Sequence, residues 1–97
     1  MNLEAFTHKT EEASKLLKLL ANEKRLLILC KLSEVEESSV SDLSQHIGLS
    51  QSALSQHLAK MREQDLVSTR REAQTIFYRI DNPAIARIME TLRDIYC

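Results

Sequence analysis

The chain has 97 residues, of which 43% are hydrophobic and 28% charged, and its formal net charge is −1. This balance describes one small globular domain and excludes a domain that is basic throughout. One Gly and one Pro leave little room for anything but helix, so the predicted class is mainly α. The sequence has no apolar run of about 18 residues and no signal-peptide pattern, so we expect a cytoplasmic protein without a membrane segment.

The first part of the chain predicts two helices. Residues 8–21 form the first, because apolar residues recur there at helical spacing: Ala13, Leu16, Leu17, Leu20 and Ala21. Asn22 is expected to cap a second helix from residue 23 to about residue 35. Its run LLILCKL is apolar on most sides and predicts the central buried helix. The acidic residues of EVEE are expected to end it in a solvated turn.

The stretch SSVSDLSQHIGLSQSALSQHL predicts two more helices joined by a tight turn. Ser39 is the expected N-cap of the first, with Asp42 three residues later as an acidic form of the capping box. Gly48 is expected to end this helix in the left-handed conformation, and Ser50 to cap the next. A helix, a glycine turn and a second helix are the signature of a helix-turn-helix.

The second of these helices has two unlike faces. Its apolar stripe is formed by Leu54, Leu58 and Met61. The opposite face, with Gln51, Ser52, Ser55 and Gln56, is polar and uncharged, although a solvated helix usually carries Glu, Lys and Arg there. Because amides and hydroxyls read base edges and phosphates, we expect this face to lie in the DNA major groove. A plain solvated face is the alternative, but it does not explain the missing charges.

After Gln64 the apolar pattern changes to alternation, which predicts two short strands around the residues REAQ. The alternating residues are Val67 and Thr69, then Ile76, Tyr78 and Ile80. The connection lacks Gly, so we expect a loose loop of several residues. Arg70, Arg71 and Gln74 are expected at the tip, where they would contact backbone phosphate or the minor groove. The alternative for each is an ordinary exposed turn residue.

The last predicted helix covers residues 83–97, since Pro83 at its first position follows the capping residue Asn82. One side of it is apolar: Ile85, Ile88, Met89, Leu92, Ile95 and Tyr96. The order of the elements is that of a winged helix-turn-helix. We therefore predict a single DNA-binding domain over residues 1–97, mainly α with a small β-hairpin.

The segments ANEKRLLILCKL and SVSDLSQHIGLSQSALSQHLAKMREQDLVSTRREAQTIFYRI resemble the arsenic-repressor type (ArsR/SmtB) of bacterial winged-helix transcription regulators. The likeness covers nearly the whole chain and keeps SQSALSQHL, the hairpin ending in IFYRI and the last helix in the order typical of the family. It implies a homodimer joined through helices 8–21 and 83–97. It also implies that two recognition helices bind successive major grooves of a pseudo-palindromic operator. We expect no enzymatic activity and no cofactor.

Many members of this family bind metals, but the usual ligand sets are missing from this sequence. The helix before the recognition helix reads VSDLSQHI and has no Cys-x-Cys, and the last helix offers apolar residues where His and carboxylates are usual. His46, His57 and Asp42 do not form a clear tetrahedral set. We expect no metal site, and a metal-responsive repressor is the alternative function.

The chain has two cysteines, Cys30 and Cys97, which match the pair in the thiol-responsive branch that contains HlyU-like and BigR/SqrR-like regulators. Membership implies a repressor or anti-silencer whose operator binding is set by persulfides, polysulfides or oxidants through a link between the two thiols. A buried, inert Cys30 is one alternative. A thiol-based redox enzyme is another, although Cys-x-x-Cys is missing. A helical dimerisation module that does not bind DNA is the third.

Overall fold

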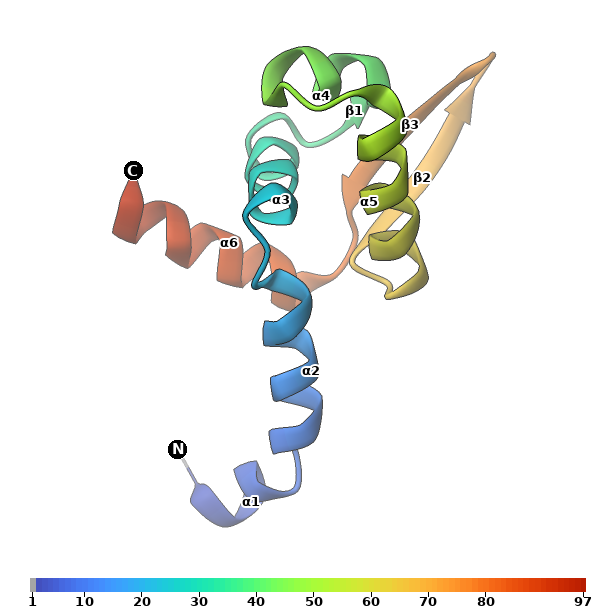
Figure 1. The fold of residues 1–97 in the computed structure, drawn as a ribbon. Coiled ribbons are helices and arrows are strands. Elements are labelled where there is room, and N and C mark those ends of the chain that lie inside the picture. Colours follow the sequence, from blue (N-terminus) through green and yellow to red (C-terminus); the bar gives the residue numbers. More distant parts are fainter. Residues whose placement is uncertain (1) are drawn as a thin grey trace.

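The computed structural model describes residues 2–97, which form six helices and three strands (Figure 1). In chain order these elements are α1 (Leu3–Thr7), α2 (Thr10–Leu20), α3 (Glu23–Val35), β1 (Ser38–Ser39), α4 (Val40–Ile47), α5 (Gln51–Glu63), β2 (Val67–Glu72), β3 (Thr75–Ile80) and α6 (Pro83–Tyr96). The predicted order of a winged helix-turn-helix is confirmed, with α1 and β1 as two elements that the sequence analysis missed.

The N-terminal helices extend away from the rest of the chain, which gives the molecule dimensions of 48 × 28 × 20 Å (Figure 1). The predicted helix 8–21 begins only at Thr10, because His8 and Lys9 form a turn. Before this turn the side chain of Asn2 caps the short α1 by accepting a hydrogen bond from the Glu4 backbone N–H at 3.0 Å. Five residues are too few to display a helical period in the sequence, which explains why α1 was missed.

The four predicted helix caps of the body are confirmed. In each, the side-chain oxygen accepts a hydrogen bond from a backbone N–H of the first helical turn. The pairs are Asn22 with Arg25 (3.0 Å), Ser39 with Asp42 (3.2 Å), Ser50 with Ala53 (3.1 Å) and Asn82 with Ala84 (2.9 Å). These contacts set where α3, α4, α5 and α6 begin.

The hydrophobic core lies where α3, α4, α5 and α6 meet the base of the sheet. Its buried residues are Leu20, Ile28, Leu29, Leu32, Leu43, Leu54, Leu58, Met61, Leu66, Val67, Ile85 and Met89. The apolar stripe of α5 is therefore confirmed as a core stripe. The stripe of α6 divides, since Ile85 and Met89 are buried while Ile95 and Tyr96 are 64% and 80% exposed.

The sheet has three antiparallel strands in the order β1-β3-β2. Its edge strand β1 pairs Ser38 and Ser39 with Tyr78 and Phe77 of β3. The prediction of a loose loop between β2 and β3 is wrong. Glu72 pairs with Thr75, so Ala73 and Gln74 alone make the turn. Ala73 adopts φ 56°, the conformation that such a tight turn needs at this position and that the sequence analysis assigned only to Gly.

Candidate nucleic-acid interface and cysteine pair

The turn between α4 and α5 fixes the angle of the recognition helix. Gly48 caps α4 with φ 81°, a left-handed conformation that a residue without a Cβ adopts at no steric cost. The Ser44 hydroxyl donates a hydrogen bond of 2.6 Å to the Leu49 carbonyl, which ties the turn back onto α4. Leu43 and Leu54 are fully buried on either side of the turn. The two helices therefore pack as one rigid unit.

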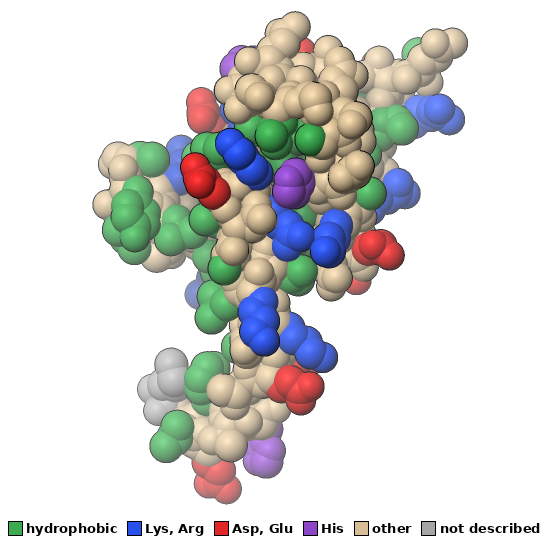
Figure 2. Space-filling model, viewed as in Figure 1, with side chains coloured by type: hydrophobic (Ala, Val, Ile, Leu, Met, Phe, Trp, Pro, Cys, Tyr) green, Lys and Arg blue, Asp and Glu red, His purple; other side chains and the backbone are tan. Residues whose placement is uncertain are grey.

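The recognition helix α5 presents its uncharged polar face to solvent. Gln51, Ser52, Ser55 and Gln56 are all exposed, opposite the buried stripe of the helix. In Figure 2, the surface over α4 and the beginning of α5 consists mainly of uncharged polar side chains and backbone, with few charged groups. Hydroxyls and amides both donate and accept hydrogen bonds, so this face suits the mixed pattern of base edges in a major groove.

Two cations that were not predicted as DNA contacts extend this face toward the end of α5. Lys60 lies four residues after Gln56, and Arg62 lies seven residues after Ser55; both are exposed. Residues at these separations share one face of a helix. This spacing is visible in the sequence, but the predicted DNA-binding face was defined by its uncharged side chains and therefore did not include the two cations.

The wing is the hairpin of β2 and β3. Gln74 lies at its tip as expected, and Arg71 lies in β2 beside the last strand residue. The expectation that Arg70 sits at the tip is wrong. Arg70 pairs with Phe77 farther down the ribbon, and its guanidinium lies over the Phe77 ring with Cζ 4.6 Å from the ring centroid.

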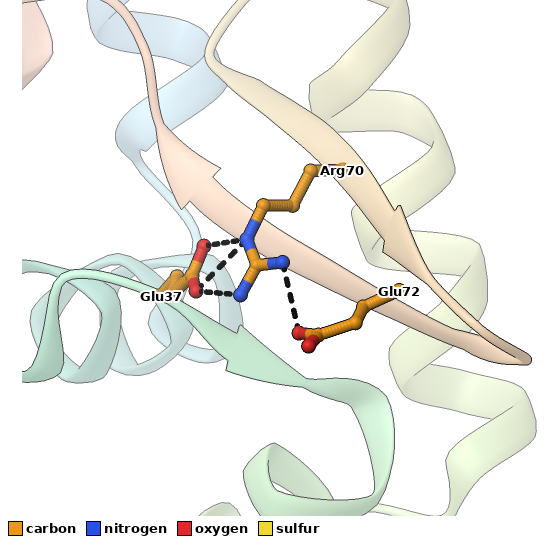
Figure 3. Close-up of polar contacts among 3 residues, drawn as sticks. All are labelled: Glu37, Arg70 and Glu72. Atoms are coloured by element: carbon orange, nitrogen blue, oxygen red, sulfur yellow. Dashed lines mark hydrogen bonds and ion pairs between the residues drawn. The ribbon is translucent and has the colours of Figure 1, made fainter.

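The guanidinium of Arg70 is held between two carboxylates (Figure 3). Its Nε donates to Glu37 Oε2 at 2.8 Å, its Nη2 donates to Glu37 Oε1, and its Nη1 donates to Glu72 Oε2 at 3.0 Å. These hydrogen bonds hold the pKa of the Glu37 carboxyl below its usual range and raise the pKa of Arg70 above its usual range. Arg70 is thus already paired in the unbound protein.

The two cysteines line one groove between α3 and the end of α6. Cys30 is half-buried, Cys97 is exposed, and both thiols are free. The groove has a volume of about 280 Å³, and its other walls are mostly apolar: Leu26, Leu27, Met89, Leu92 and Tyr96, with Glu23 and Arg93. The Arg93 side chain also donates to the Ser33 hydroxyl at 3.3 Å, which joins α6 to α3 beside the groove.

The remaining titratable groups do not gather in the way a metal site requires. Across residues 2–97, no three His, Cys, Asp or Glu side chains lie close enough to hold a metal ion. His46 instead places Nδ1 2.7 Å from the Asp42 carbonyl oxygen, within its own helix. Within the same described range, no helix is long and apolar enough to cross a membrane.

Comparison with known proteins finds relatives that are all bacterial transcriptional regulators. Residues 22–69 match the family model "Bacterial regulatory protein, arsR family". The transcriptional activator HlyU of Vibrio cholerae is 48% identical over 97 residues, which are 100% of this chain and 89% of that protein. The biofilm growth-associated repressor of Xylella fastidiosa is 39% identical, over 100% of this chain and 84% of its own length. The structure of reduced HlyU from Vibrio cholerae has 47% identity and a TM-score of 0.89, covering 97% of this chain and 98% of that one.

Proposed function

Because the chain belongs to the arsR family of bacterial regulatory proteins and is a DNA-binding transcriptional regulator, we propose that its affinity for DNA is set by Cys30 and Cys97. The observation that carries this proposal is that the two thiols share one groove although they are distant in sequence. A relative whose structure is described as reduced supports a redox role. We place the protein in the cytoplasm, where it has access to the chromosome.

The proposed DNA contacts come from α5 and the wing. Side chains of Gln51, Ser52, Ser55 and Gln56 would read base edges and phosphates in the major groove. Arg71 and Gln74 would contact the backbone from the wing. The pairing of Arg70 with Glu37 and Glu72 favours a role for Arg70 other than direct DNA contact.

The change Ser55→Ala with Gln56→Ala tests the proposed contacts. We expect it to abolish specific binding because it removes hydrogen-bonding groups without touching the buried stripe. Circular dichroism should show unchanged helicity, since Ala is a good helix former. Unchanged affinity for a duplex selected by the wild-type protein would contradict the assignment of this face.

We further propose that the protein acts as a homodimer joined through its terminal helices. Large apolar side chains stay exposed on these helices in the single chain: Leu3, Phe6, Leu17, Ile95 and Tyr96. Figure 2 displays hydrophobic groups around α1 and along α6. Exposed apolar side chains of this size mark an interaction site, and a two-fold dimer would place two recognition helices on one pseudo-palindromic operator.

The proposed chemistry joins the two thiols. With a persulfide donor, the thiolate of one cysteine attacks the outer sulfur of the donor, becomes a persulfide, and releases the donor as a thiol. Attack by the other thiolate on the inner sulfur of this protein persulfide forms the Cys30–Cys97 disulfide and releases hydrogen sulfide. A polysulfide donor leaves additional sulfur atoms in the bridge, which spans a wider gap than a disulfide does.

A bridge between Cys30 and Cys97 would tie the end of α6 to α3. This constraint reaches the DNA face because α3 packs against α4, the first helix of the helix-turn-helix. A coupling of about 1–3 kcal/mol between the two sites changes DNA affinity roughly 5- to 150-fold. The relatives include one activator and one repressor, and both roles are compatible with this switch. A bound dimer either blocks transcription or displaces another silencer.

The test compares reduced protein with protein treated with a persulfide donor, using fluorescence anisotropy on the selected duplex and mass spectrometry of both samples. We expect affinity to fall as a Cys30–Cys97 link appears in the peptide spectrum. Cys30→Ser and Cys97→Ser should each bind DNA normally when reduced and lose the response to the donor. A response that survives in both variants would contradict the proposal.

The metal-responsive alternative is tested on the same duplex. Zinc and copper are titrated into the reduced wild-type protein while anisotropy is followed. We expect neither ion to bind stoichiometrically and weaken DNA binding, because the described residues offer no three-ligand cluster. Stoichiometric binding with loss of DNA affinity would replace the thiol proposal with a metal switch.

A further inference from the structure

The Arg70 side chain connects the two edges of the sheet. Arg70 lies on β2 directly across from Phe77 of β3, and Phe77 lies across from Ser39 of β1 on its other side. The guanidinium lies over the Phe77 ring. It reaches Glu37, in the connection between α3 and β1 (Figure 3). A single side chain therefore links the outer strand of the wing to the segment that leads directly into the helix-turn-helix.

The backbone before Glu37 is held in an unusual conformation. Glu36 caps α3 with φ 73° and ψ −49°, a region that residues with a Cβ rarely adopt. Its N–H bonds the Leu32 carbonyl at 3.0 Å, and the next N–H, of Glu37, bonds the Val35 carbonyl at 2.9 Å. Such a conformation persists only when its surroundings fix it. Here it turns the chain so that the Glu37 carboxylate faces the wing.

Little else fixes the outer part of the wing. Val67 is buried and Tyr78 and Ile80 are half-buried, so the base of the hairpin is anchored in the core. Residues 70–76 are all exposed, and β1 pairs with β3 only at Tyr78 and Phe77. Within the described sheet, the ribbon beyond Phe77 is thus paired only with itself, and the Arg70–Glu37 contact joins the wing to the body beside the last β1–β3 pair.

We propose that the Arg70–Glu37 pair sets the angle of the wing relative to the recognition helix, so that Arg71 and Gln74 meet the DNA backbone. Arg70 and Glu37 are then positioning residues and not DNA ligands. The pair has the bidentate Arg–carboxylate geometry that fixes orientation. This inference rests on the proposed function, since it requires the wing to lie against DNA.

The substitution Glu37→Gln separates this inference from its main rival. If Arg70 itself bound a phosphate, Glu37 would compete for it, and Glu37→Gln would strengthen binding. If the pair positions the wing, the same change weakens binding. The matched control is Glu34→Gln, which removes one negative charge from the end of α3 but has only an ion pair to Lys31 within its own helix.

The probe is a fluorescein-labelled duplex selected by the wild-type protein from a random library, titrated at several salt concentrations. We expect Glu37→Gln and Arg70→Gln each to weaken binding about three- to tenfold, and the double variant to be no weaker than Arg70→Gln alone. The log-log salt slope should become shallower by about 1 for each wing phosphate lost, while Glu34→Gln keeps the wild-type slope. Hydroxyl-radical footprints should lose protection only at the flanks.

If the Glu37→Gln variant binds the duplex as tightly as the Glu34→Gln variant or more tightly, the inference is overturned while the proposed function stays intact. Additive effects of the two single variants would overturn it too, because independent residues do not form a positioning pair. Circular dichroism and thermal unfolding check that each variant folds; we expect little change, since an exposed ion pair contributes little to stability. A wild-type protein that selects no duplex would overturn both the inference and the proposed function.

Discussion

At the scale of single residues, Gly48 offers a clean test of backbone conformation. A Cβ added there meets no atom within 4 Å, so Gly48→Ala changes only the cost of φ 81°. We expect this variant to lower the free energy of unfolding by about 1 kcal/mol in urea denaturation. Gly48→Asn should lower it less, because Asn tolerates the left-handed region. Equal stability of Gly48→Ala and wild type would show that α4 can end in another way.

The lowered pKa of Glu37 predicts that the free energy of unfolding depends on pH. Its pKa in the folded protein lies below the ordinary value of 4.5 because Arg70 donates hydrogen bonds to the carboxylate. A carboxyl with a lowered folded pKa contributes stability above its unfolded pKa and loses that contribution as the pH falls through its folded pKa.

We therefore expect the small stability difference between wild type and Glu37→Gln to be constant from about pH 6 to about pH 8 and to shrink below about pH 4.5. Urea denaturation of both proteins over this range provides the measurement. A difference that changes between pH 6 and pH 8 would assign the contribution to another titrating group.

The helix caps and the Arg70–Glu37 ion pair differ in whether the sequence predicts them. The caps at Asn22, Ser39 and Ser50 were predicted because each binds an N–H only three residues away. The partner of Arg70 was not, because Glu37 lies 33 residues earlier in the chain and is brought near only by the sheet. Local hydrogen bonds can be predicted from residue type and spacing, whereas this ion pair depends on how separate elements pack.

At the scale of elements, the wing turn carries a testable strain. Ala73 adopts φ 56° at the first of the two central turn positions, where Gly is preferred. We expect Ala73→Gly to raise the free energy of unfolding by up to about 1 kcal/mol, since the relief of strain exceeds the added freedom of the unfolded chain. Ala73→Val should lower it. Thermal unfolding of the three proteins measures this, and a less stable Ala73→Gly would mean that the turn is unstrained.

The elements that the sequence analysis missed are the shortest ones. β1 has two residues, Ser38 and Ser39, and no alternation of apolar and polar side chains reveals it. It is a strand because β3 offers Tyr78 and Phe77 for pairing, a long-range condition. The longer helices α3 to α6 were predicted within a few residues, because each combines a cap with a continuous apolar face.

At the scale of the whole molecule, the exposed apolar groups of the terminal helices predict self-association. We expect wild-type protein to sediment as a dimer, and Leu17→Glu to shift it toward the monomer because a charge enters the apolar contact. Val35→Glu is the control, since Val35 is also exposed but lies on α3, outside the terminal helices. Sedimentation that does not differ between wild type and Leu17→Glu would contradict an interface through α2.

The surface of the recognition helix has a consequence for how the regulator finds its site. Sequence-independent attraction to DNA comes from cations that neutralise phosphates, and the exposed face at the beginning of α5 carries none. The cations beside this face are Lys60 and Arg62 at the end of α5 and Arg71 in the wing, and the net charge of the chain is −1, so we expect binding to unrelated DNA to be weak. A chromosome offers about 10⁶ or more competing sites, so weak background binding leaves more copies free to search. If the proposed thiol switch holds, operator occupancy would then follow the chemical state of Cys30 and Cys97 even at low copy number.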